Sequence, residues 1–123
     1  MLILFVEYHA AFRQSAAFMM DQEEDLKVGS QAASVAEGCE RMAEGGIDTA
    51  IVDIPLPDDG APELVRSLHE ANPSGQVLGT THIEDEGVHE EFLAAGAREV
   101  LPKAMTYPEI LAAVRRLGDE PWQ

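Results

Sequence analysis

Three features are scarce in this 123-residue sequence: cysteine, long apolar runs and positive charge. A single cysteine, Cys39, excludes an internal disulfide bond and is typical of proteins from a reducing compartment. No apolar run approaches the ~20 residues that a membrane-spanning helix requires. We therefore expect a cytoplasmic protein without a transmembrane segment.

Positive charge is outnumbered: 8 lysine and arginine residues stand against 23 aspartate and glutamate residues, for a formal net charge of −15. Nucleic-acid backbones are bound by clustered cations, so this composition disfavours direct nucleic-acid binding. Binding to an anionic membrane surface is disfavoured for the same reason. Hydrophobic residues still make up 46% of the chain. That share supports one globular domain over residues 1–123, with residues 119–123 expected as a frayed tail.

Short apolar segments alternate with amphipathic segments along the chain. The apolar segments predict strands at about residues 2–6, 26–29, 49–53, 76–81 and 99–101. Apolar residues at helical spacing predict helices at about residues 9–20, 34–44, 62–71, 88–95 and 106–117. Strict alternation of this kind favours right-handed crossovers and a doubly wound α/β fold. In such a fold a five-stranded parallel sheet is covered by helices on both faces.

Asp53 stands out because it directly follows residues 50–52, a charge-free apolar run of the kind that a buried strand needs. A carboxylate at that place loses hydration, so it requires a partner or a function. In open parallel sheets, ligands bind in the crevice at the carboxyl ends of the strands. A single aspartate is more often only a cap for the following turn, so the other strand ends decide between the two interpretations.

Polar side chains also follow other predicted strands: Glu7 and Tyr8 after the first, Thr81 at the end of the fourth, and Lys103 after the fifth. In a doubly wound sheet these residues converge with Asp53 on one edge. Two carboxylates, a hydroxyl and an ammonium group suit phosphoryl transfer to a carboxylate. Asp53 would be the nucleophile, and a hard divalent cation would offset charge on the phosphoryl group. Lys103 and Thr81 would each contact a phosphate oxygen.

Three segments carry a resemblance to the receiver domains of two-component response regulators. Residues 4–13 match the first strand, acidic pair and following helix of that family, and residues 53–57 match its phosphoacceptor and proline turn. Residues 95–103 match the stretch that ends in its lysine. The resemblance covers essentially the whole chain and is closest to receivers that precede helix-turn-helix output domains. It implies a (βα)5 flavodoxin-like three-layer sandwich with strand order 2-1-3-4-5.

The resemblance also implies a function: a bacterial phosphoprotein in a two-component phosphorelay. Asp53 would accept a phosphoryl group from a histidine kinase or phosphotransfer protein, and the domain would signal through a protein interface. Family spacing makes Thr81, rather than Thr80, the switch hydroxyl and makes Lys103 the phosphate contact. No enzyme activity is implied beyond intrinsic phosphotransfer and autodephosphorylation.

The implied metal site departs from the family pattern. Mg²⁺ would be held by Glu7, Asp53 and the backbone carbonyl of Pro55, but Tyr8 stands where the family has its second acid. A phenol with an ordinary pKa near ~10 is neutral at cellular pH and replaces a carboxylate poorly on Mg²⁺. We therefore expect weak Mg²⁺ binding.

Other functions stay open at this point. Tyr8 favours a pseudo-receiver, a protein-interaction module of the same fold that does not depend on phosphate. An aspartate-nucleophile phosphatase would need an acid two residues after Asp53, where Pro55 stands. A flavin or nucleotide binder would need a phosphate-binding loop in place of residues 9–12. The sequence contains no helix-turn-helix segment, and it identifies neither a downstream partner or output domain nor the interface of a homodimer.

Overall fold

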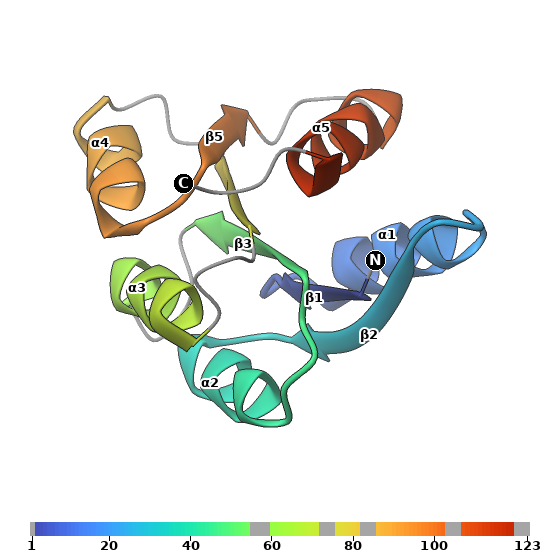
Figure 1. Cartoon of the computed structure of the whole chain (residues 1–123), viewed down its shortest axis with the longest axis horizontal. Helices are drawn as coiled ribbons and strands as arrows, with labels where there is room; N and C mark the ends of the chain where they lie inside the picture. The colour runs from blue at the N-terminus through green and yellow to red at the C-terminus, as the bar shows by residue number, and fades with distance from the viewer. Residues whose placement is uncertain (1, 55–59, 72–75, 82–85, 103–106, 120–123) are drawn as a thin grey trace.

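A parallel sheet with helices on both faces forms the protein in the computed structural model, which describes residues 2–54, 60–71, 76–81, 86–102 and 107–119 (Figure 1). The strand order is β2-β1-β3-β4-β5, and the pairs β1–β2, β1–β3, β3–β4 and β4–β5 are all parallel. The predicted α/β class and strand order are therefore confirmed.

Strands and helices alternate through the described part of the chain. The strands are β1 Leu2–Val6, β2 Lys27–Ala32, β3 Thr49–Ile54, β4 Gln76–Thr81 and β5 Glu99–Pro102. The helices are α1 Ala10–Asp21, α2 Val35–Ala43, α3 Ala61–Ala71, α4 Glu86–Ala95 and α5 Tyr107–Asp119. None of these helices, within the described ranges, is long and apolar enough to cross a membrane. Asp119, the first residue of the predicted tail, is instead the last residue of α5. Residues 120–123 of that tail lie outside the described residues.

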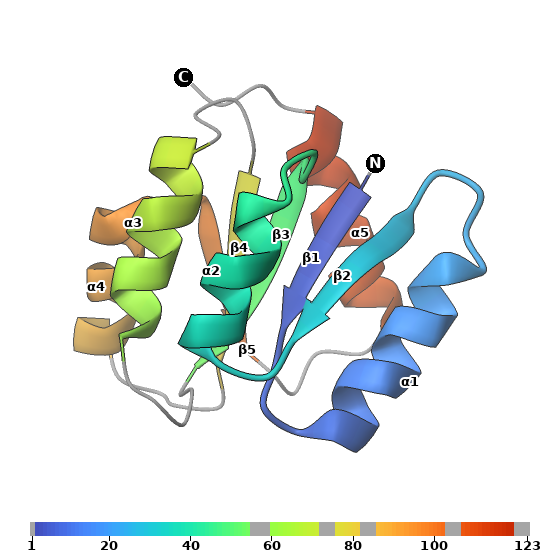
Figure 2. The ribbon, with the colours of Figure 1, turned by 90° about the horizontal axis from the view of Figure 1, so that it is seen from below.

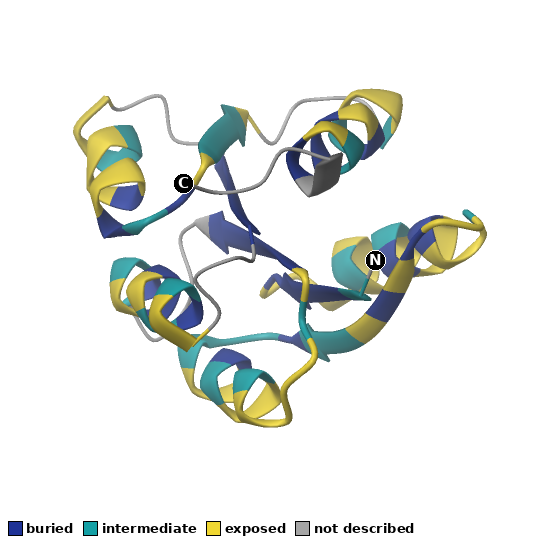
Figure 3. Ribbon diagram, in the orientation of Figure 1, coloured by how far each residue is buried: buried dark blue, intermediate teal, exposed yellow. Residues whose placement is uncertain are grey.

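The sheet separates two apolar clusters. Helices α2, α3 and α4 cover one face, and α1 and α5 cover the other (Figure 2). Successive side chains of a strand point to opposite faces, so β1 serves both clusters. Leu4 and Val6 pack toward α2, α3 and α4, whereas Ile3 and Phe5 pack toward α1 and α5. Burial is accordingly concentrated on the central strands and on the inner sides of the helices (Figure 3).

Helix α2 has defined signals at both ends. The Ser34 hydroxyl accepts a hydrogen bond from the Glu37 backbone N–H at 3.2 Å, and the Glu37 carboxylate accepts one from the Ala33 N–H at 3.0 Å. The first bond satisfies an N–H group that the first helical turn leaves open, and the second joins the residue before the cap to the helix. After the helix, Gly45 and Gly46 have φ values of 80° and 81°, a conformation that side chains with a Cβ avoid. The helix accordingly ends close to the predicted position, residue 44.

Strand β2 differs from its prediction. It was expected at residues 26–29 but runs from Lys27 to Ala32, because its pairing with β1 continues until Ala32 lies opposite Val6. The pairing contains an irregularity between Ile3 and Leu4. The residues that follow residue 29 do not have the apolar pattern of a strand, and the pairing with β1 holds them in one.

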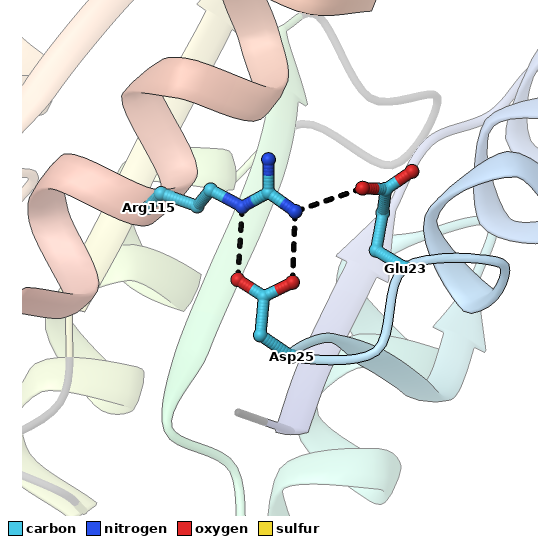
Figure 4. A network of polar contacts seen from close by, with 3 residues as sticks. All are labelled: Glu23, Asp25 and Arg115. Carbon is cyan, nitrogen blue, oxygen red and sulfur yellow. Dashed lines mark hydrogen bonds and ion pairs between the residues drawn. The ribbon is translucent and has the colours of Figure 1, made fainter.

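Helix α5 is held by its apolar face and by arginine. Leu111, Val114 and Leu117 are buried against the α1 side of the sheet. Arg115 donates from Nε and Nη2 to the two carboxylate oxygens of Asp25, both at 2.8 Å, and its Nη2 also donates to Glu23 at 2.8 Å (Figure 4). This two-pronged contact joins α5 to the loop between α1 and β2. The hydrogen bonds from Arg115 lower the pKa of Asp25 to about 2.

Candidate functional site

Two carboxylates are buried at the carboxyl ends of neighbouring strands. Strands β1 and β3 pair with Val6 opposite Val52, so the next residues, Glu7 and Asp53, lie side by side at one edge of the sheet. Glu7 is fully buried, and only 2% of Asp53 is exposed. Burial of two like charges is costly unless hydrogen bonds or cations compensate it. This edge is therefore the part of the described structure where chemistry is most strongly indicated.

Asp53 accepts a hydrogen bond from a threonine to which the sequence assigned no role. The Thr80 hydroxyl donates to Asp53 Oδ1 at 3.1 Å, and both side chains are buried. The register explains this contact, because Asp53 lies opposite Thr80 while Ile54 lies opposite Thr81. Side chains at paired positions share a face of the sheet. A single sequence does not reveal register, so nothing in it singled out Thr80.

Thr81 follows Thr80 in β4 and is also buried, at 2% exposure. It lies opposite Pro102, the last residue of β5, and position 103 comes next in the sequence. Lys103 itself and Pro55 lie outside the described residues. The roles of Thr81 and Lys103 toward phosphate, and of the Pro55 carbonyl toward Mg²⁺, stay predictions.

The loop after β1 is fixed from α1. Arg13 donates from Nη1 to the backbone carbonyl of Glu7 at 2.7 Å and from Nε to the Gln31 side chain at 3.3 Å. His9 Nδ1 lies 3.8 Å from Glu7 Oε1. Tyr8, in contrast, is 55% exposed, and its ring meets the His9 ring edge-on with centroids 5.6 Å apart. The phenol is thus largely in solvent, while the acid before it is buried.

The described residues offer two carboxylates for a cation. Among them, no three histidine, cysteine, aspartate or glutamate side chains gather into a group that could hold a metal. Mg²⁺ in proteins is often bound by one or two carboxylates, with water and phosphate supplying its remaining ligands. Glu7 and Asp53 fit this requirement. Tyr8 adds no third carboxylate, so the donor set is small.

The family model of the response regulator receiver domain matches residues 3–115. The chain belongs to this family. Among curated relatives of the receiver, the DNA-binding transcriptional activator DevR/DosR of Mycobacterium tuberculosis is 30% identical over 117 residues, which cover 94% of this chain and 54% of the relative. Response regulator GacA of Pseudomonas viridiflava is 27% identical over 113 residues, 92% of this chain and 53% of the relative. The receiver spans about half the length of these relatives.

A solved structure supports the same fold for the receiver. The CheY-like response regulator receiver domain protein from Methanospirillum hungatei has a TM-score of 0.89 at 24% identity, covering 96% of this chain and 93% of the other. At this identity the likeness shows the fold alone.

The family membership confirms the predicted family and places the chain in two-component signal transduction. Receiver domains are phosphoacceptor signalling domains rather than typical enzymes. They generally bind Mg²⁺ at their acidic site and interact with histidine kinases or phosphotransfer proteins. These properties belong to the family and frame the proposal for this member.

Proposed function

We propose that this receiver is a cytoplasmic protein that accepts a phosphoryl group on Asp53 from a histidine kinase or phosphotransfer protein and passes the signal on through a protein interface. One observation carries the proposal: in a chain of this family, Asp53 is buried at the end of β3 beside the fully buried Glu7. Burial of a carboxylate in that position destabilises the fold, and a role as the nucleophile of phosphoryl transfer explains its presence there.

The proposed step is a displacement at phosphorus. A carboxylate oxygen of Asp53 attacks the phosphorus of a phosphohistidine on the partner, an O–P bond forms, and the N–P bond breaks. The imidazole leaves with the electron pair of that bond and takes up a proton. The Thr80 hydroxyl, which donates to Asp53 Oδ1 at 3.1 Å, orients the attacking carboxylate. Orientation of the nucleophile lowers the entropic part of the barrier.

Mg²⁺, when bound, offsets the negative charge that collects between carboxylate and phosphoryl oxygens. Glu7, Asp53 and the Pro55 carbonyl would hold it. We assign a phosphate contact to Lys103 and a hydrogen bond to phosphate to Thr81, on the basis of the resemblance and of their place beside the ends of β4 and β5. With Tyr8 in place of an acid, Mg²⁺ affinity should be low, and Glu7→Gln should lower it further.

The first prediction tests the acceptor. Incubation with Mg²⁺ and a small phosphoryl donor such as phosphoramidate should add one phosphoryl group to the wild-type chain, measured by intact-mass spectrometry. Asp53→Asn should abolish this gain, because an amide oxygen is a far weaker nucleophile than a carboxylate. Asp48→Asn is the matched control, because Asp48 is exposed and directly precedes β3 at its opposite end. Labelling that survives Asp53→Asn would overturn the assignment.

A second candidate function is a pseudo-receiver that recognises its partner without phosphate. The observation that favours it is the 55% exposure of Tyr8 where the family has an acid. If wild type takes up no phosphoryl group but Tyr8→Asp does so at Asp53, the pseudo-receiver is the better description. If neither chain is labelled, the assignment of the strand-end residues to phosphoryl transfer fails.

A further inference from the structure

Arg13, in the first half of α1, is the only arginine or lysine before Lys27 in the sequence, and its side chain is half-buried. Its guanidinium group has acceptors in two different elements. Nη1 donates to the backbone carbonyl of Glu7 at 2.7 Å, and Nε donates to the side-chain oxygen of Gln31 in β2 at 3.3 Å. Helix α1 lies alongside β2 (Figure 2), so one side chain joins the helix, the edge strand and the loop after β1.

The backbone of Glu7 is held on both sides. Its N–H donates to the carbonyl of Ala32 in β2 at 2.9 Å, and its carbonyl accepts from Arg13. The next side chain adds little restraint, because Tyr8 is 55% exposed. Glutamate has several rotatable bonds, so its carboxylate keeps one position only where the backbone and the surroundings are fixed. Arg13 therefore restrains the residue that would supply a carboxylate to Mg²⁺.

The position of Glu7 matters more in this chain than in a receiver with two acids after the first strand. Glu7 and Asp53 lie side by side, and Tyr8 adds no third carboxylate. Among the described residues, no third acidic, histidine or cysteine side chain completes a metal-binding group. Mg²⁺ demands near-ideal octahedral geometry, so a displaced ligand is lost rather than followed by the ion. A displaced Glu7 carboxylate thus has no substitute in the described part of the chain.

Groups that orient a metal ligand affect the affinity of a metal site although they do not touch the metal. We propose that Arg13 is a positioning residue for the cation site: by joining the Glu7 carbonyl to Gln31, it holds the Glu7 carboxylate where that group binds Mg²⁺ beside Asp53. This role rests on the proposed function, because Glu7 and Asp53 are the carboxylates of the proposed cation site.

The positive charge of Arg13 and its hydrogen bonds have opposite effects on cation binding. A guanidinium group near the site repels Mg²⁺, so loss of the charge alone should strengthen Mg²⁺ binding. Loss of the hydrogen bonds should weaken it, because Glu7 is no longer held. A role limited to fold stability should lower the free energy of unfolding and leave the affinity of the folded protein unchanged. The sign of the change in Mg²⁺ affinity therefore separates the three roles.

The test begins with Arg13→Met, which keeps most of the apolar stem and removes the donors and the charge. Mg²⁺ is titrated into the isotope-labelled chain and followed by amide NMR. Arg13→Met should bind Mg²⁺ about 3- to 10-fold more weakly than wild type, at or below the lower end of the effect of groups that orient a metal ligand. Arg66→Met is the matched control: it removes one positive charge from an exposed position of α3, on the other face of the sheet, and should not weaken binding. Unchanged or stronger binding in Arg13→Met would overturn the inference.

Arg13→Lys separates the two hydrogen bonds from the charge. Lysine keeps the charge, but all its donors are on one nitrogen, so it replaces the planar guanidinium fork between Glu7 and Gln31 poorly. This variant should bind Mg²⁺ at least about 2-fold more weakly than wild type. Wild-type affinity in Arg13→Lys would also overturn the inference, because any cation at this position would then suffice.

Hydrogen exchange shows whether the loop after β1 moves without the rest of the fold. Exchange of the Glu7 amide hydrogen, which is bonded to Ala32, should quicken in Arg13→Met, while exchange at residues 3–6 stays as in wild type. Faster exchange throughout β1 would mean that Arg13 supports the whole fold, and would overturn the specific role.

A second background separates failure of this inference from failure of the proposed function. The Mg²⁺ titration is repeated in Tyr8→Asp, with and without Arg13→Met, because the added acid should strengthen the site. Mg²⁺ binding that is absent from both wild type and Tyr8→Asp would overturn the proposed cation site and this inference with it. Binding that is present and that Arg13→Met does not weaken would overturn this inference alone.

Discussion

At the scale of single residues, the hydrogen bond between Thr80 and Asp53 is the least expected feature of the site. Family spacing assigns a phosphate contact to Thr81, which stays a prediction, while the pairing of β3 with β4 sets Thr80 beside the aspartate. Which of the two adjacent threonines contacts Asp53 depends on strand register, which emerges only when the sheet forms. The sequence did predict that Glu7 and Asp53 lie together at one edge of the sheet, because charged residues that end apolar runs are visible without tertiary contacts.

Replacement of Thr80 tests this hydrogen bond. Thr80→Val keeps the shape of the side chain but removes the donor, so it leaves an acceptor of a buried carboxylate less satisfied. We expect a loss of about 1–3 kcal/mol in the free energy of unfolding, measured by urea denaturation. Thr80→Ser keeps the hydroxyl and should retain most of that contribution. Equal losses in the two variants would mean that packing, not the hydrogen bond, accounts for the effect.

The ion pair between Asp25 and Arg115 predicts a pH dependence. Arg115 lowers the pKa of Asp25 to about 2 in the folded protein, below the ordinary value of 3.8. Because the pKa of Asp25 is lower in the folded than in the unfolded chain, the contribution of this ion pair to stability is present above about pH 4. It is lost as the pH falls toward 2. In an NMR titration, Arg115→Gln should return the pKa of Asp25 to its ordinary range. Arg116→Gln, which removes a pair with Glu99 instead, should leave Asp25 unchanged.

At the scale of elements, apolar periodicity was enough to predict the strands and helices of the described chain. Boundaries that depend on a partner strand were not predictable, as the extension of β2 to Ala32 shows. The exposure of Phe12 and Met19 was not predictable either, because apolar residues at helical spacing indicate a buried helix face without showing which of them the neighbouring elements leave uncovered. The exposed fraction of a side chain between two helices depends on how the helices pack, and a sequence pattern does not specify that packing.

The attachment of α5 to the sheet can be tested by truncation of its apolar face. Leu111→Ala and Val114→Ala each remove buried volume from the cluster between α5 and the sheet. Each should lower the free energy of unfolding by about 1–4 kcal/mol. Ala112→Ser, at an exposed position of the same helix, should change it by less than about 0.5 kcal/mol. Losses below that limit in both truncated variants would contradict the packing of this helix.

At the scale of the whole molecule, charge is the dominant feature, with a formal net charge of −15 on 123 residues. Like charges on a compact domain repel one another, and dissolved salt screens this repulsion. We expect the melting temperature at pH 7 to rise between about 20 mM and 300 mM NaCl. KCl should raise the melting temperature as much as NaCl does, because screening depends on ionic strength and not on the identity of the cation. A melting temperature that falls with salt would show that attractive pairs such as the Arg115 contact outweigh the net repulsion.

The contact of Arg115 with Asp25 has a consequence for the order in which the chain is made, because it joins residues that are 90 positions apart. On the ribosome, Glu23 and Asp25 emerge early, and they lack this counter-charge until α5 is synthesised. Until then, Ile3, Ile51 and Leu78 also lack the cover that Val114 and Leu117 provide. A nascent chain that stops before α5 therefore exposes an apolar sheet face beside uncompensated acids. Such a chain is a substrate for chaperones and proteases rather than a folded domain.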